Sequence, residues 1–351
     1  MSENERNRYD RALDYCVAKT RLNLDRLDAF PHTTRDGRWR TSEHGRWTAG
    51  HWIGVIWLAY LRTGDPDLRE AAYAWAQRLE PRKTDVTTHD MGFLFYPSFV
   101  RGYRITGDPW FRDAAVVAAR SLATRFHEPG DYIQAWDEAE DPIHRGRTIV
   151  DTVMNLPLLL WAAEETGETR LREIALRVAE TTIANHVRPD GSTYHVVDFD
   201  PEIGRAVWRG THQGLHDESY WTRGQAWAIY GFASIARIAM RPDLRAVAEQ
   251  LADFFVGQAN LDEAPPWDFA AQGAGVPRDA AAGAIAADGL LDLAAAGGID
   301  ADLRRQQALR LLDALVATCT DDSASPRQGL LLHATADLPR NSAVDESLMY
   351  G

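Results

Sequence analysis

Two aspartates, Asp90 and Asp151, are candidates for acid–base catalysis. Asp90 comes just before Met91-Gly92-Phe93, and Asp151 is followed by Thr152 and then the apolar pair Val153-Met154. A single aspartate in such a position is more often a helix N-cap. Two carboxylates that face one site can instead divide into an acid and a base when their surroundings separate their pKa values, the usual solution for glycosidic chemistry.

Aromatic and hydrogen-bonding side chains accompany the two aspartates. The chain contains 12 Trp, 11 Tyr and 11 Phe. Aromatic rings most often pack in cores, but they also stack on the apolar faces of ligands. The helix ends predicted below place five such residues at the same end of the fold as the aspartates: Trp47, His89, Gln213, Arg223 and Trp227. This mixture of stacking faces and polar groups is typical of a sugar pocket.

A repeated motif indicates the elements that position these residues. Thr63-Gly64-Asp65-Pro66 is repeated as Thr106-Gly107-Asp108-Pro109 and, less closely, at 166–172, 240–245 and 298–304. Glycine just past a helical pattern ends a helix, and Asp or Thr shortly afterwards caps the next one. Each copy therefore predicts a corner between two helices. Five corners, with one more hairpin formed by the terminal helices, predict an all-α fold, a six-hairpin (α/α)6 barrel in a single domain over residues 1–351.

The spacing before each corner predicts where the polar residues meet. Segments before the corners are apolar all round, which is typical of buried inner helices, and those after the corners carry more charge. Trp47, Asp90, Asp151, Arg223 and Asp279 each lie 16 to 18 residues before a corner, or about 25 Å from it along a helix. They should share one mouth of the barrel. Helix N-termini at that mouth favour negative charge, which predicts an anionic ligand.

Composition excludes several other classes of protein. The 351 residues include 38 Lys+Arg and 51 Asp+Glu, a net charge of −13, so nucleic acid and anionic membranes are not expected partners. Cys16 and Cys319 form no metal motif, and His212 and His216 have helical spacing but no third ligand. We therefore expect neither metal nor cofactor. The sequence MSENERNRYD has no signal-like apolar stretch, which predicts a soluble, cytoplasmic protein, either a monomer or a weak homo-oligomer.

At these same residues the chain resembles the unsaturated glucuronyl hydrolases of glycoside hydrolase family 88. The matching segments are spread over nearly the whole chain in the order of the family: Trp47-Thr48-Ala49-Gly50-His51-Trp52, His89-Asp90-Met91-Gly92-Phe93, Asp151-Thr152-Val153-Met154-Asn155-Leu156-Pro157, Gln213-Gly214, Trp221-Thr222-Arg223-Gly224-Gln225-Ala226-Trp227 and Trp267-Asp268-Phe269. No single segment is specific, but together they are.

The resemblance implies a metal-free barrel that acts on oligosaccharides ended by a 4,5-unsaturated uronic acid. Hydration of the C4=C5 bond in such a sugar releases its neighbour. By position, Asp151 would be the general acid and base, and Asp90 would assist by binding the sugar and tuning Asp151. The remaining positions would bind substrate, two of them by stacking (Trp47, Trp136) and five through polar or ring contacts (His89, His195, Gln213, Arg223, Trp227), with Arg223 on the sugar carboxylate.

The resemblance also implies that the chain lacks the last C-terminal helix of the family. Three other functions stay open at this point. The same chemistry could act on unsaturated rhamnogalacturonyl fragments of pectin, or the ring could bind anionic glycans without turnover. A sugar epimerase is a third reading, although that chemistry favours several histidines at the mouth rather than carboxylates.

Overall fold

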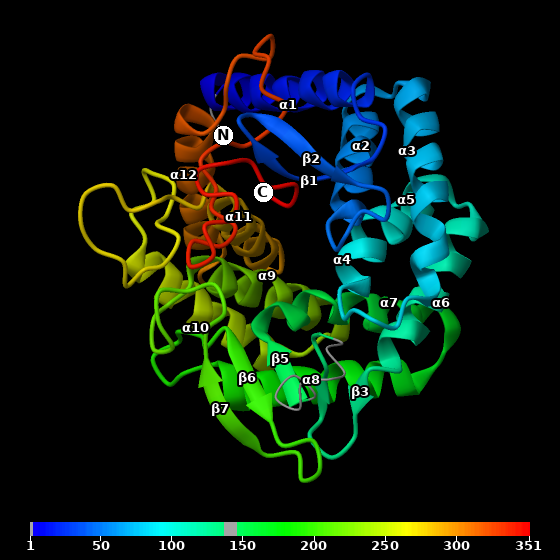
Figure 1. Ribbon diagram of the computed structural model, residues 1–351, viewed down its shortest axis with the longest axis vertical. Coiled ribbons are helices and arrows are strands. Elements are labelled where there is room, and N and C mark those ends of the chain that lie inside the picture. Colours follow the sequence, from blue (N-terminus) through cyan, green and yellow to red (C-terminus); the bar gives the residue numbers. More distant parts are fainter. Residues whose placement is uncertain (1–2, 137–145) are drawn as a thin grey trace.

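Helical hairpins follow one another around a ring in the computed structural model, which describes residues 3–136 and 146–351 (Figure 1). The first helix, α1 (Glu3–Leu24), packs against the last, where the Tyr9 hydroxyl donates to Asp313 Oδ1 at 2.6 Å. Five hairpins follow α1, and the fifth ends in this last helix. They are α2 (Ala49–Thr63) with α3 (Pro66–Leu79), α4 (Met91–Phe95), η2 (Tyr96–Val100) and α5 (Arg101–Thr106) with α6 (Pro109–Ala123), α7 (Leu156–Thr166) with α8 (Thr169–His186), α9 (Thr222–Ala239) with α10 (Pro242–Gln258), and α11 (Ala280–Ala295) with α12 (Ala301–Thr318). This arrangement confirms the predicted barrel.

The first two corners have the full predicted chemistry, whereas no side-chain cap forms on α8, α10 or α12 at the other three. Gly64 and Gly107 both adopt φ of 70°, the left-handed conformation that ends a helix. Asp65 then caps α3 by accepting from the Asp67 N–H at 3.0 Å, and Asp108 caps α6 in the same way. The fourth corner differs, because Met240 takes the left-handed conformation with φ of 54°.

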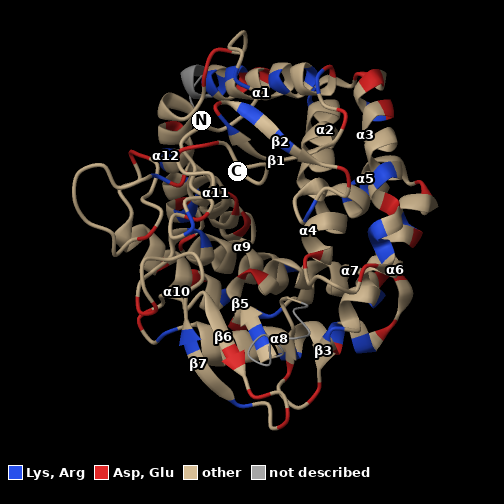
Figure 2. Ribbon diagram, in the orientation of Figure 1, with Lys and Arg blue, Asp and Glu red and all other residues tan. Residues whose placement is uncertain are grey.

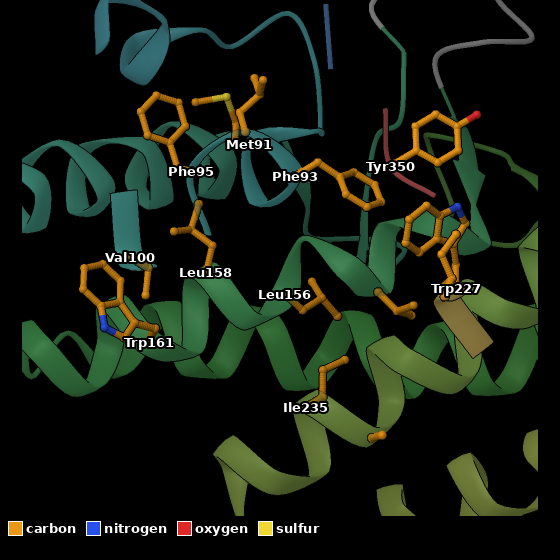
Figure 3. Packing of buried hydrophobic residues seen from close by; sticks show 14 of the residues in the cluster. Met91, Phe93, Phe95, Val100, Leu156, Leu158, Trp161, Trp227, Ile235 and Tyr350 are labelled. Carbon is orange, nitrogen blue, oxygen red and sulfur yellow. The ribbon is translucent and has the colours of Figure 1, made fainter. Parts of the chain in front are cut away.

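Burial separates an inner ring from an outer one. On α3 the buried residues form a single stripe that includes Leu68, Ala72, Trp75 and Leu79, whereas α9 is buried on nearly all sides. Charged residues of both signs mark the outer helices α1, α3 and α6, while α2 is largely uncharged (Figure 2). The inner helices meet through apolar side chains of α4, α7 and α9 (Figure 3). In the described ranges, none of the helices combines the length and apolar character required to cross a bilayer.

Short strands were largely missed by the sequence reasoning. An antiparallel hairpin joins β1 (Phe30–Arg35) to β2 (Arg38–Ser42) through Asp36 and Gly37, both with positive φ. That Asp-Gly pair between Thr- and Trp-containing segments is a hairpin signal that the sequence does contain. A second pair joins β3 (Phe126–His127) to β4 (Tyr132–Ile133), and β5 (Arg147–Ile149), β6 (Val196–Phe199) and β7 (Ala206–Gly210) form one sheet.

Two glycines bring the starts of the inner helices together. A Cβ atom on Gly50 of α2 would lie 2.2 Å from the carbonyl oxygens of Phe93 and Leu94, and one on Gly92 of α4 would lie 2.2 Å from the Asn155 Cα. No side chain fits at either position. Asn155 completes the contact by accepting from the Phe93 N–H at 3.0 Å. Helices α2, α4 and α7 therefore begin side by side, which gathers the residues that precede them.

Candidate active site

A cavity of about 690 Å³ opens at the N-terminal ends of the inner helices, and Asp90 and Asp151 both line it. We call it the central cavity. Its volume lies in the range of ordinary small-molecule sites. Of the residues expected to bind substrate, four contribute to its walls: Trp47, His89, Trp136 and Gln213.

Asp151 is buried without full compensation. It lies in the short helix η4 (Val150–Met154) that leads into α7, and the N-cap of that element is Ile149, so Asp151 does not act as a cap. Its Oδ2 atom has no hydrogen-bond partner among the described residues. Burial raises the pKa of Asp151 to about 7, with the charge of Arg223 opposing the rise and that of Asp90 adding to it. A carboxyl with this pKa can both give and take a proton near neutral pH.

Asp90 has a more open setting. It occupies the N-cap position of α4, yet its side chain makes no capping hydrogen bond. Instead, its Oδ2 accepts from the Thr88 hydroxyl at 2.8 Å, and 16% of its side chain is exposed. Neither aspartate thus performs the capping role that is more common at such positions, and both carboxylates are available to a ligand.

A buried histidine stands behind each aspartate. Burial lowers the pKa of both His89 and His195, so both rings are neutral near pH 7. The Nδ1 atom of His195 accepts from the His212 backbone N–H at 3.2 Å, which leaves the proton on Nε2, 3.7 Å from Asp151 Oδ2. His89 contacts the Thr152 hydroxyl through Nδ1 at 3.0 Å and directs Nε2 at Asp90 Oδ1, 3.3 Å away.

Aromatic rings and an amide form the walls around the carboxylates. The Trp47 ring lies 4.5 Å from the Tyr350 ring and 5.2 Å from that of Phe93, centroid to centroid. Trp136 packs at 4.9 Å against the ring of His212. The Gln213 side-chain amide donates to the Ala336 carbonyl at 2.6 Å, which fixes its orientation. The two tryptophans come from different elements and give the cavity two aromatic faces.

Arg223 does not reach the central cavity, contrary to the expectation that it binds the substrate carboxylate. It is only 1% exposed, and its guanidinium pairs with Asp279 and donates to the Thr335 carbonyl at 2.7 Å. The charge of Arg223 is therefore neutralised by Asp279 within the protein. The ring of Tyr350 covers it, with the guanidinium carbon 5.4 Å from the ring centroid. Arg223 acts on the cavity through its field at Asp151 rather than by contact.

Trp227 and His195 also lie behind the cavity wall rather than in it. Trp227 is 2% exposed, and its ring contacts Phe93 at 5.0 Å and Tyr350 at 6.0 Å (Figure 3). His195 is buried against the ring of Trp221 at 4.1 Å. Trp227 and His195 were expected to contact the sugar directly, but neither lines the cavity. They pack behind the residues that do.

Sequence reasoning missed much of the lining. His212 also lines the cavity, although it was considered only as a possible metal ligand. The lining residues that were given no role comprise Ile149, a group of basic or aromatic residues, and a group carried by the last segment of the chain: His32, Arg46, Phe93, Arg147, Ile149, Ala336, Asp337, Arg340, Ser342 and Tyr350. The last segment reaches the mouth because it pairs with β1, where the Met349 N–H donates to the His32 carbonyl at 3.0 Å. No local sequence pattern predicts pairing between segments so far apart in the chain.

The possible metal pair His212 and His216 lies on a loop, not on a helix. His212 faces the rings of Trp136 and His195, and its Nδ1 lies 3.1 Å from a guanidinium nitrogen of Arg340. Across the two described ranges, no group of three or more His, Cys, Asp or Glu side chains is arranged to hold a metal ion.

The chain is similar to known proteins over most of its length. Residues 21–256 match the model of Glycosyl Hydrolase Family 88. An unsaturated glucuronyl hydrolase of Bacillus sp. (strain GL1) is 39% identical over 89% of this chain and 83% of its own length. An unsaturated chondroitin disaccharide hydrolase of Streptococcus pyogenes serotype M1 is 34% identical over 97% of this chain and 87% of its own. A solved structure of an unsaturated glucuronyl hydrolase variant with dGlcA-Glc-Rha-Glc superimposes with a TM-score of 0.93 and 33% identity, over 97% of this chain and 92% of that one. This chain belongs to glycosyl hydrolase family 88.

Proposed function

We propose that this protein removes the 4,5-unsaturated uronic acid from the non-reducing end of oligosaccharides made by polysaccharide lyases. The observation that carries the proposal is Asp151, a carboxyl with a pKa of about 7 that shares an aromatic-lined cavity with Asp90. Relatives named unsaturated glucuronyl hydrolase and unsaturated chondroitin disaccharide hydrolase support this substrate class. The reaction is a hydration that ends in cleavage.

Asp151 would first act as the acid. Its protonated carboxyl gives the proton to C4, the C4=C5 electron pair forms the new C–H bond, and positive charge develops at C5 and the ring oxygen. Water then adds at C5 as the Asp151 carboxylate takes the water proton, which restores the starting state. The resulting hemiketal opens and releases the neighbouring sugar. A pKa near the working pH suits a group that must serve both steps.

Asp90 would orient the sugar and hold the second negative charge. Its partly exposed carboxylate accepts hydroxyl hydrogen bonds, and its charge favours the protonated form of Asp151. His195 would present its Nε2 proton to Asp151 Oδ2, and His89 would do the same for Asp90. Both histidines are then positioning residues.

Binding of an anionic sugar would depend on the walls. Trp47 and Trp136 offer faces for the apolar sides of the sugar rings. Arg46, Arg147 and Arg340 also line the cavity, beside the carboxylates of Asp90, Asp151 and Asp337. Arg147 is paired with Asp198 and Arg340 with Asp337. The substrate carboxylate would meet these arginines rather than the buried Arg223.

The test is turnover of a lyase-generated unsaturated disaccharide, followed by loss of the ultraviolet band of its conjugated enoate. We expect the protein to abolish the band and release the neighbouring sugar, and Asp151→Asn to do neither at a comparable rate. Calorimetric binding without loss of the band would instead favour a non-catalytic glycan-binding ring. An isomerised, uncleaved product would indicate an epimerase.

Substrate competition separates the two hydrolase readings. Unsaturated disaccharides from chondroitin, hyaluronan, heparin, gellan and ulvan would be compared with an unsaturated rhamnogalacturonyl disaccharide from pectin. We expect the glucuronyl substrates to be preferred, and preference for the pectin fragment would transfer the assignment to that activity. A cytoplasmic location and a monomeric or weakly oligomeric state stay predictions from the sequence.

A further inference from the structure

The sheet beside the central cavity carries an aromatic residue that neither the sequence reasoning nor the proposed reaction uses. Strands β5, β6 and β7 lie next to one another (Figure 1), and their register pairs Arg147 with Asp198 and Asp198 with Trp208. Directly opposed residues on neighbouring strands project from the same face of a sheet. Arg147, Asp198 and Trp208 therefore form one row across three strands.

This row begins in the cavity and ends outside it. Trp136 and Arg147 line the cavity, whereas Trp208 does not and is 36% exposed. The Arg147 guanidinium carbon lies 5.9 Å from the centroid of the Trp136 ring and 5.7 Å from that of Trp208. A cation between two indole rings links them at a spacing typical of cation–π contacts. The aromatic surface thus continues from the cavity wall over its rim.

The row is held rigid by its middle member. Asp198 accepts two hydrogen bonds from Arg147, from Nε at 2.6 Å and from Nη2 at 2.7 Å, and only 7% of its side chain is exposed. Such bidentate pairs fix the plane of the guanidinium. The Trp208 ring lies over Gly210, where a Cβ atom would be 2.3 Å from Trp208 Cζ2. Contacts with its own strand and with the Arg147 guanidinium therefore restrict the orientation of the Trp208 indole.

We propose that Trp208 forms an outer sugar-binding subsite that takes the third sugar of an oligosaccharide leaving the central cavity over Arg147. The occupant is a pyranose ring of the same substrate, recognised by stacking on the indole, and the proposal rests on the proposed function. The disaccharide at the catalytic carboxylates would not reach Trp208. Chain-length preference would then be set outside the catalytic machinery.

The test compares two substrates in one variant. We expect Trp208→Ala to lower kcat/KM for dGlcA-Glc-Rha-Glc by about 3- to 10-fold, the range of a lost aromatic contact, and to change that for dGlcA-Glc by less than about 2-fold. Trp208→Phe should keep most of the tetrasaccharide activity. Val207→Ala is the matched control, because Val207 is 65% exposed and adjoins Trp208 on the same strand.

Equal loss on both substrates would show that Trp208 only supports the sheet, and no loss on either would remove it from recognition; both results overturn the proposal. Binding keeps the subsite testable if turnover fails. In the Asp151→Asn background, calorimetry with the same two sugars should show the tetrasaccharide dissociation constant rising 3- to 10-fold on Trp208→Ala and the disaccharide constant unchanged. Absence of turnover with intact binding would contradict the proposed function alone.

Discussion

Asp151 and Asp279 both lie buried at the start of an inner helix, but the protein treats their charges in opposite ways. Asp279 is fully buried, caps α11 by accepting from the Ala282 N–H at 3.3 Å, and pairs with Arg223. Asp151 has neither a cap to serve nor an ion-pair partner in contact, and its Oδ2 is unpartnered within the described ranges. The charge of Asp279 is thus balanced by protein groups, whereas Asp151 keeps an oxygen that can interact with a substrate.

This difference separates a structural site from a reactive one. Burial of a charge costs several kcal/mol unless a partner and hydrogen bonds offset it. Burial raises the pKa of Asp279 as well, but the charge of Arg223 and hydrogen bonds from the backbone and from Arg223 oppose that rise. Asp151 has the charge of Arg223 and one backbone hydrogen bond but no contacting cation, so burial raises its pKa to about 7 and it holds its proton up to neutral pH. A buried carboxyl whose charge is not fully compensated has a shifted pKa, and such groups are typical of catalytic sites.

The largest expected effect comes from Asp151→Asn. It removes the only acid that the proposed reaction uses, so we expect the rate of enoate loss to fall by about 1000-fold or more, equivalent to about 4 kcal/mol in the barrier. The variant should fold normally, because the amide needs no compensation for a buried charge. Circular dichroism and the ultraviolet assay would check both points, and a nearly unchanged rate would remove Asp151 from its role.

The same substitution should change how stability depends on pH. The pKa of Asp151 rises from 3.8 in the ordinary state to about 7 when folded, so its contribution is fully present below about pH 4 and is lost as pH rises towards 7. At about 1.4 kcal/mol for each pH unit, the loss is about 4 kcal/mol by pH 7. Asp151→Asn should therefore be more stable than the parent at pH 7 but not at pH 4, as measured by urea unfolding. Equal stability differences at the two pH values would contradict this.

Asp279→Asn should have the opposite balance of effects. It leaves the Arg223 guanidinium buried without its partner, and breaking such a pair costs about 3–5 kcal/mol. We expect a large loss in the free energy of unfolding, measured in urea. Asp262→Asn is the matched control, because Asp262 pairs with Arg310 on the surface and should cost less than about 1 kcal/mol. Similar values for the two variants would contradict the contrast.

Features of the fold and site that depend on local sequence patterns could be predicted, and those that depend on contacts between distant segments could not. The corner glycines, the inner helices and the meeting of Asp90 with Asp151 follow from local patterns and helix geometry. Whether Arg223 faces the ligand or Asp279 depends on side-chain packing between α9 and α11, which spacing along the chain does not encode. Tyr350 reaches the cavity through pairing of the last segment with β1, and no local pattern encodes that contact either.

Gly92→Ala would disturb the cavity carboxylates while leaving the buried ion pair intact. The added Cβ would meet the Asn155 Cα at 2.2 Å, so α4 and α7 must separate. We expect a stability loss of about 1–3 kcal/mol from overpacking and a fall in activity beyond what the unfolded fraction explains. Gly257→Ala is the control, since nothing lies within 4 Å of its Cβ, and it should be neutral or stabilising by up to about 1 kcal/mol. Full activity of Gly92→Ala would show that this contact does not position the site.

The smallest effect is expected at His195. Its Nε2 lies 3.7 Å from Asp151 Oδ2, too far for a hydrogen bond. An N–H at that distance should stabilise the carboxylate only weakly, so we expect His195→Phe to raise the pKa of Asp151 by less than one pH unit. The alkaline limb of kcat/KM would move up by that amount, and the rate would change by less than about 10-fold. His195→Gln, which keeps an N–H donor, should restore most of the parent profile. Identical limbs in the parent and His195→Phe would exclude the interaction.

The most direct test of the account is a pH titration of the Asp151 carboxyl carbon by nuclear magnetic resonance in protein labelled with ¹³C at the aspartate side chains, with Asp151→Asn used to assign the signal. We predict a resonance that is absent from the variant and titrates with a midpoint near pH 7. A midpoint near pH 4 would show that burial leaves Asp151 ionised at neutral pH, and the distinction from Asp279 would then not explain catalysis.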